Sequence, residues 1–87
     1  MTRFQRTRLI RLEWQLRSRE DGRLLQCGIF ETDEGQALMA GRDAGWLWYL
    51  PLENGRSPVS VARTASGWRD TVLATGAYDE VDRDVHV

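Results

Sequence analysis

The sequence predicts an α+β fold: a three- or four-stranded antiparallel meander sheet, covered on one face by a single C-terminal amphipathic helix. Three observations lead to this fold class. Apolar and polar residues alternate near the start of the chain, glycine-containing turns separate successive apolar runs, and one helix signature follows in the second half. A sheet that buries one face needs a covering layer, and the helix supplies it.

The first predicted strand spans about residues 7–19 and has the clearest pattern in the chain. Its apolar residues fall at every second position, and side chains of a β-strand alternate between its two faces. We therefore expect one buried face and one face in water. The apolar set is Ile10, Leu12, Trp14 and Leu16, and the polar set is Arg11, Glu13, Gln15 and Arg17.

Two further strands complete the predicted meander. Asp21 and Gly22 favour a tight hairpin turn, because glycine adopts the positive φ that such a turn needs. A second strand follows over residues 23–32, a second turn over 32–35 and a third strand over 36–42. Residues 46–50 are rich in strand formers and end at Pro51, which cannot donate to a ladder. They form either a fourth strand or an ordered apolar loop.

The predicted helix begins at Ser57 and Pro58, since serine caps free amides and proline is tolerated in the first turn. Apolar residues then recur at spacings of four, three and four, which gives one apolar stripe. Gly76 is the expected stop. The stripe is Val61, Ala65, Trp68 and Val72. We expect Trp68 to pack over Leu12, Trp14 and Ile29.

Length and composition predict one domain over residues 1–87, with a loose basic arm at 1–6 and a frayed acidic tail at 82–87. The net charge is −1, so no strong overall field favours nucleic acid or a membrane. No apolar run approaches the roughly 20 residues of a membrane span. The N-terminus lacks the apolar core of a secretory signal. The single cysteine, Cys27, forms no intrachain disulfide. We expect a cytoplasmic bacterial protein.

The stretch from Gly22 to Gly35, GRLLQCGIFETDEG, resembles a group of small uncharacterised bacterial proteins. In that group a strand and turn with the pattern C-G-I-[YF]-x-T-D-x-G precede another strand and a late helix containing Trp-Arg, which Trp68 and Arg69 match here. The resemblance covers about residues 21–80 and departs at 40–48, where the group has a more polar connection. The group has no known activity, so the resemblance implies the fold and leaves the function open.

The residues that could support catalysis are few. His86 is the only histidine and lies next to the C-terminal residue, on a segment expected to fray, whereas a general base must be held in place. Cys27 shares a strand face with Leu25 and Ile29, as a small buried hydrophobe does. The carboxylates of residues 79–84 lack the spacing of a calcium loop. We therefore expect no enzyme activity, no cofactor and no metal.

Protein association is the favoured functional interpretation. Residues 46–50 form a run of five large, mostly apolar residues, which is more than a small domain easily buries. Tryptophan and tyrosine are also enriched in the hot spots of protein interfaces. A homodimer or a complex with another protein would cover them. The alternative is that the segment is a fourth core strand or a lid across the edge of the helix. The candidate interface residues are Trp46, Leu47, Trp48 and Tyr49.

Nucleic-acid binding is the alternative function. Arginines cluster near the N-terminus, and arginine binds phosphate through paired hydrogen bonds. A solvated sheet face explains the same residues more simply, since the net charge of −1 is far from that of a basic domain. The candidate contacts are Arg3, Arg6, Arg8 and Arg11, with Arg17 further along the same strand.

Overall fold

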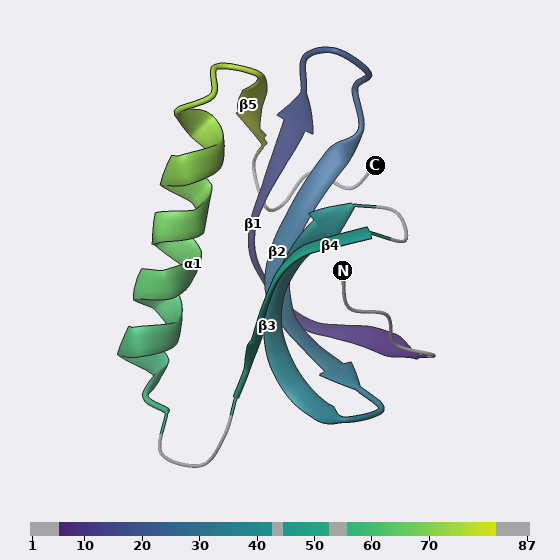
Figure 1. Ribbon diagram of the computed structural model, residues 1–87, viewed down its shortest axis with the longest axis vertical. Helices are drawn as coiled ribbons and strands as arrows, with labels where there is room; N and C mark the ends of the chain where they lie inside the picture. The colour runs from purple at the N-terminus through teal and green to yellow at the C-terminus, as the bar shows by residue number, and fades with distance from the viewer. Residues whose placement is uncertain (1–5, 43–44, 53–55, 82–87) are drawn as a thin grey trace.

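The computed structural model describes residues 6–42, 45–52 and 56–81. This part of the chain forms two layers, in which helix α1 lies along one face of a strongly curved antiparallel sheet (Figure 1). The α+β fold class, with a meander sheet and one helix, is confirmed. The elements are β1 (Thr7–Ser18), β2 (Leu24–Thr32), β3 (Gly35–Arg42), β4 (Gly45–Pro51), α1 (Pro58–Leu73) and β5 (Tyr78–Val81).

The strand order is β4-β3-β2-β1-β5, and every neighbouring pair is antiparallel. Residues 46–50 therefore belong to a fourth strand and not to a loop. The fifth strand, β5, was not among the three or four that the sequence predicts. After α1 the chain returns to the sheet, where Tyr78–Val81 pairs with Gln15–Ser18 of β1. Arg19 secures this junction, because its N–H donates to the Ala77 carbonyl at 2.9 Å and its guanidinium contacts Asp79 at 2.8 Å.

Strand β1 breaks its alternation at two places. Its register with β2 shifts on either side of Ile10 and again on either side of Glu13, so each of these is an extra residue in the strand. An extra residue reverses the face of the side chains that follow it. Trp14 faces the helix, whereas Leu12 lies opposite Gly28 on the other face, and Ile10 is exposed. The prediction that the apolar residues of this strand share one face is wrong for its first half.

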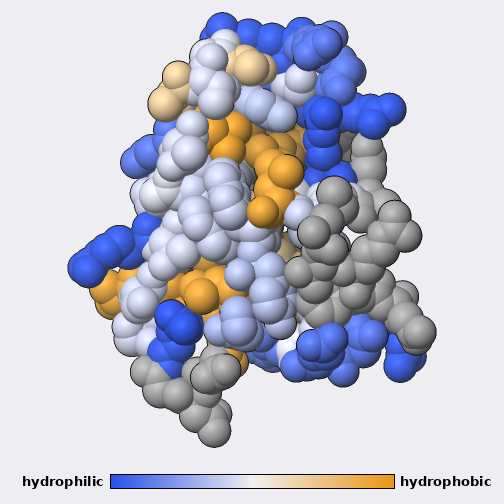
Figure 2. Space-filling view, in the orientation of Figure 1, coloured by the Kyte–Doolittle hydropathy of each residue, from blue (hydrophilic) through white to orange (hydrophobic). Residues whose placement is uncertain are grey.

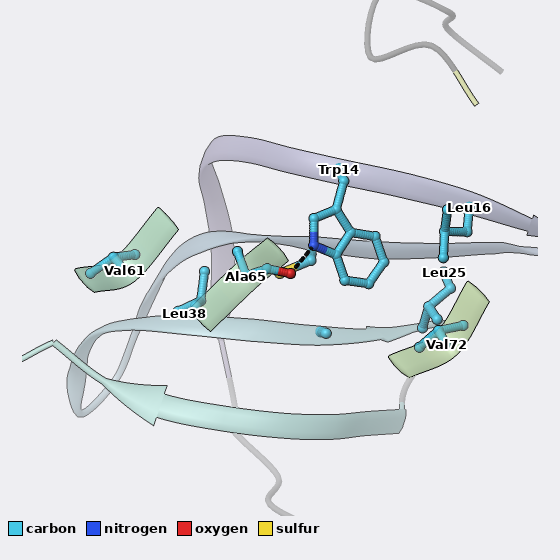
Figure 3. Close-up of a cluster of buried hydrophobic side chains, with 9 residues drawn as sticks. Trp14, Leu16, Leu25, Leu38, Val61, Ala65 and Val72 are labelled. Atoms are coloured by element: carbon cyan, nitrogen blue, oxygen red, sulfur yellow. Dashed lines mark hydrogen bonds between the residues drawn. The ribbon is translucent and has the colours of Figure 1, made fainter. Parts of the chain in front are cut away.

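The larger core lies between the sheet and α1. Figure 3 shows Trp14 of β1 reaching towards the helix, where its indole N–H donates to the carbonyl oxygen of Ala65 at 2.7 Å. A buried indole N–H needs such a partner. Trp68 lies at the border of this core and stacks on Trp48, with ring centroids 5.4 Å apart, which is not the predicted packing over Leu12. The buried members are Trp14, Leu16, Leu25, Cys27, Leu38, Ala40, Val61, Ala65 and Val72.

The ends of α1 follow the sequence signals. The Ser57 hydroxyl accepts a hydrogen bond from the Ser60 N–H at 3.1 Å, and Pro58 occupies the first turn, where its missing N–H costs no helical bond. Gly76 follows the helix with φ +77°, a conformation that glycine adopts without strain. The predicted start and stop of the helix are confirmed.

A second apolar cluster lies on the sheet face opposite α1, here called the open face. Phe30, Ala37 and Met39 are buried there, and Trp46 and Tyr49 pack against them. The rings of Phe30 and Trp46 meet edge to face, with centroids 4.8 Å apart. Both faces of the sheet therefore carry apolar side chains, although only one of them packs on the helix.

Strands β1 and β2 lie unusually close together at Gly28, and substitution of two glycines tests whether this contact requires a residue without a side chain. A Cβ added at Gly28 would clash with the carbonyl oxygen of Arg11 and lie 3.2 Å from the Cα of Leu12, whereas one added at Gly67 of α1 meets nothing within 4 Å. We expect Gly28→Ala to lower the free energy of unfolding by about 1–3 kcal/mol, as overpacking does. Gly67→Ala should raise it by roughly 0.5–1 kcal/mol.

Urea unfolding followed by circular dichroism measures both glycine variants. Gly67→Ala is the matched control, because it makes the same chemical change in open space. Equal effects of the two substitutions would contradict a steric requirement at Gly28.

Candidate functional site

The segment predicted to bind protein forms β4, an edge strand of the sheet. Its aromatic side chains are divided between the two faces: Trp48 packs on the helix side, while Trp46 and Tyr49 pack on the open face. Leu47 is an extra residue in β4, where the register with β3 shifts, and it is 59% exposed. The four predicted residues are thus a half-buried strand with one exposed leucine, and not one continuous patch.

Only a short part of the outer edge of β4 can pair with an incoming strand, because both of its ends are irregular. The N–H of Leu52 donates to the carbonyl of Gln36 at 3.0 Å, so the preceding residue, Pro51, directs its backbone away from β3. A proline at this position loses no bond to β3 and offers no N–H to an incoming strand. At the other end, the bulge at Leu47 twists the edge. The regular part of the edge therefore runs only from Trp48 to Leu50.

On the opposite side of the sheet, the terminal strand β5 covers only Gln15–Ser18 of β1, and it is short and charged. β5 has four residues, which include Asp79 and Glu80. The hydrogen bond from Arg19 is the main cause that lowers the pKa of Asp79, so this carboxylate is ionised at neutral pH. No charged residue occurs in Gly45–Pro51 of β4. The terminal strands β4 and β5 therefore differ in both length and charge.

Exposed apolar residues are scattered over the surface. On the face shown in Figure 2, apolar residues reach the surface in separate patches divided by polar ones. The large hydrophobic residues that are exposed in the described part of the chain are Leu9, Ile10, Leu47 and Val59.

The arginines predicted to contact nucleic acid do not form one stripe. Arg3 lies outside the described residues. Arg8 pairs with Glu31 at 3.2 Å, and Arg11 pairs with Glu13 at 3.1 Å. Arg6 and Arg8 line one polar hollow, whereas Arg11 lines a separate cleft of about 260 Å³ beside the start of α1. The bulge at Ile10 separates these positions along β1.

A different set of arginines comes together on the open face. Arg17, Arg23 and Arg42 line a hollow of about 600 Å³, together with Phe30 and Trp46. These residues belong to four different strands and the turn between β1 and β2. The sequence indicates Arg17 as part of an arginine stripe on β1, but no local pattern links Arg23 or Arg42 to it.

Asp21, in the turn between β1 and β2, holds the side chain of Arg42 and accepts a hydrogen bond from the backbone of Arg23. The Nη1 atom of Arg42 contacts its two carboxylate oxygens at 3.2 and 3.4 Å, and the N–H of Arg23 donates to Oδ1 at 3.0 Å. The bond from the Arg23 N–H is the main cause that lowers the pKa of Asp21, and Ser18 and Arg42 act in the same direction. Asp21 is therefore ionised at neutral pH and orients Arg42.

Gly41 allows Trp46 to approach the sheet. A Cβ at Gly41 would clash with the carbonyl oxygen of Gly45, and it would lie 2.8 Å from the Cα of Trp46 and 2.9 Å from its ring atom Cε3. A glycine at this position therefore lets both the backbone of β4 and the indole lie close to β3. The wall of the hollow thus depends on a small residue in the neighbouring strand.

The candidate catalytic residues offer little chemistry. Cys27 is fully buried, and desolvation raises the pKa of its thiol to about 12, so the reactive thiolate is absent at neutral pH. The predicted core position of Cys27 is confirmed. His86 lies outside the described residues. Within the described ranges, no group of three metal-ligating side chains could hold an ion, and no helix is long and apolar enough to cross a membrane.

Comparison of the chain with protein-family models, with curated protein sequences and with solved structures found no match. The resemblance of residues 21–80 to small bacterial proteins stays a prediction. The candidate sites therefore rest on geometry and charge alone.

The burial of Cys27 predicts slow reaction with thiol reagents. We expect a disulfide reagent at about pH 8, where an ordinary cysteine with a pKa near 8.5 reacts readily, to label the native protein far more slowly than the urea-unfolded protein. Absorbance of the released thiol measures both rates. Equal rates would show that Cys27 is accessible in the folded chain.

Proposed function

We propose that this chain is a non-enzymatic cytoplasmic bacterial protein that acts by protein association, as a homodimer. In the proposed dimer the β4 strands of two copies pair antiparallel across a two-fold axis. The observation that carries the proposal is the contrast between the terminal strands β4 and β5, since β4 has no charged side chain and an exposed leucine, whereas β5 carries two carboxylates.

Charge favours β4 as the surface for a second copy. In a two-fold interface the same patch meets itself, so each charge near the axis faces a like charge. Between Gly45 and Pro51 there is no such charge. Pairing through β5 would instead bring Asp79 and Glu80 close to the same carboxylates of the second copy, and like charges directly opposite on paired strands are destabilising.

Apolar side chains must supply much of the binding free energy. The bulge at Leu47 and the proline at Pro51 leave room for only a short backbone ladder. Complete burial of a leucine side chain contributes roughly 1.5–3 kcal/mol, and the two-fold axis doubles each contribution. We therefore expect a dimer of modest affinity whose formation resists salt, because screening weakens interactions between charges and not apolar contacts.

Light scattering coupled to size-exclusion chromatography tests the proposal over a range of protein concentrations. The expected mass rises from that of the 10.0 kDa monomer towards twice that value, at both low and high salt. Leu47→Lys should abolish the rise, because it places two ammonium groups at the axis. Leu47 is exposed, so this substitution leaves the fold intact.

Val59→Lys is the matched control for Leu47→Lys. Val59 is 66% exposed and lies in the first turn of α1, away from β4, and it loses the same kind of apolar side chain to the same charge. This variant should dimerise as the parent chain does. A monomer at every concentration, or equal effects of the two substitutions, would refute dimerisation through β4.

A further inference from the structure

We infer that the hollow on the open face binds a nucleotide, with its phosphate held by Arg17, Arg23 and Arg42 and its base against Trp46. Such a ligand is either a free nucleotide or one unit of a single-stranded nucleic acid, since both present the same phosphate and ring. This site does not depend on the pairing of β4 strands, because it uses the face of the sheet and not its edge.

The cationic side of the hollow is held in position by the surrounding backbone and by Asp21. Arg17 donates from Nη1 to the carbonyl of Gly22 at 3.1 Å, and Arg42 contacts Asp21 through Nη1 as well. A guanidinium carries five N–H donors, so these contacts use only part of its capacity. Arginines oriented in this way can bind phosphate oxygens through paired, charge-assisted hydrogen bonds.

The other side of the hollow is aromatic. Phe30 and Trp46 line it in edge-to-face contact, which fixes the indole, and Trp46 remains half-buried and accessible from the hollow. Stacking of a base on an aromatic side chain contributes about 1–3 kcal/mol and depends little on which base is present. The side-chain amide of Gln26 adds a polar group to the same wall.

The size of the hollow favours a nucleotide over a bare anion. Its volume of about 600 Å³ falls within the roughly 300–1,000 Å³ of small-ligand sites and far exceeds that of an inorganic phosphate. Three guanidinium groups suit a phosphate, and the adjacent rings suit a flat heterocycle. Because the net charge of the whole chain is −1, the attraction is local, and we expect binding to be strongest at low salt.

Fluorescence anisotropy of a short fluorescein-labelled oligothymidylate, titrated with the full chain at low salt, tests the inference. We expect saturable binding that weakens as salt rises. Arg17→Gln and Arg42→Gln should each weaken it about tenfold and reduce the salt dependence, as the loss of one phosphate contact does. Circular dichroism and protection of Cys27 from labelling confirm that each variant is folded.

Arg63→Gln is the matched control, because Arg63 is exposed on α1, on the other side of the sheet, and loses the same charge. It should bind as the parent chain does. An equal loss in all three variants would attribute binding to net charge and overturn the site, as would the absence of binding at low salt.

Competition separates the two sources of the ligand. Displacement of the oligonucleotide by thymidine monophosphate supports a site for free nucleotides. Binding of the oligonucleotide that this competitor does not displace, but that Arg17→Gln and Arg42→Gln weaken, supports single-stranded nucleic acid. Equal displacement by inorganic phosphate and by thymidine monophosphate would show that the ring contributes nothing, and would overturn the role of Trp46.

Discussion

The close approach of β1 and β2 at Gly28 is the constraint on which the rest of the structure depends. Extra residues at Ile10 and Glu13 put two bulges into β1 on either side of this contact. Bulges bend the strand that contains them and increase its twist. A side chain at Gly28 would collide with the backbone of β1, so the bend requires a glycine there. The curvature visible in Figure 1 follows from this local geometry.

The bulges determine how a chain of 87 residues divides its apolar side chains. After the second bulge, Trp14 and Leu16 join the core beneath α1, and the indole of Trp14 bonds to the helix backbone. Before it, Leu12 lies on the open face, where Phe30 and Met39 are also found. A small domain has little interior, so use of both sheet faces increases the apolar area that it buries.

Strand β4 contributes residues both to the proposed dimer interface and to the proposed nucleotide site, but through different surfaces. Its outer edge and Leu47 are available to a second copy, whereas the ring of Trp46 lies on the open face beside the arginines. Gly41 allows this arrangement, because a side chain there would clash with the carbonyl oxygen of Gly45 and crowd the indole of Trp46. A protein partner and a nucleotide would therefore contact the same strand from different directions.

The sequence by itself determined the local features of this protein. The positive φ angles of Gly22, Gly35 and Gly76 and the cap at Ser57 lie where the residue types require them. For this reason the turns, the boundaries of the first three strands and the ends of the helix could all be predicted. Each depends on the conformational preferences and hydrogen bonds of a few neighbouring residues.

Only the tertiary structure decided which distant residues meet. The bulges of β1 arise from its pairing with β2, and β5 exists because the chain leaving α1 reaches a free edge of β1. The contact of Arg42, at the end of β3, with Asp21 in the first turn joins residues 21 positions apart, and no period in the sequence encodes it. An alternating sequence predicts that side chains point to the two faces of a strand in turn, but one extra residue reverses this order. The free energy that favours a bulge at one position comes from packing against the other strands and the helix.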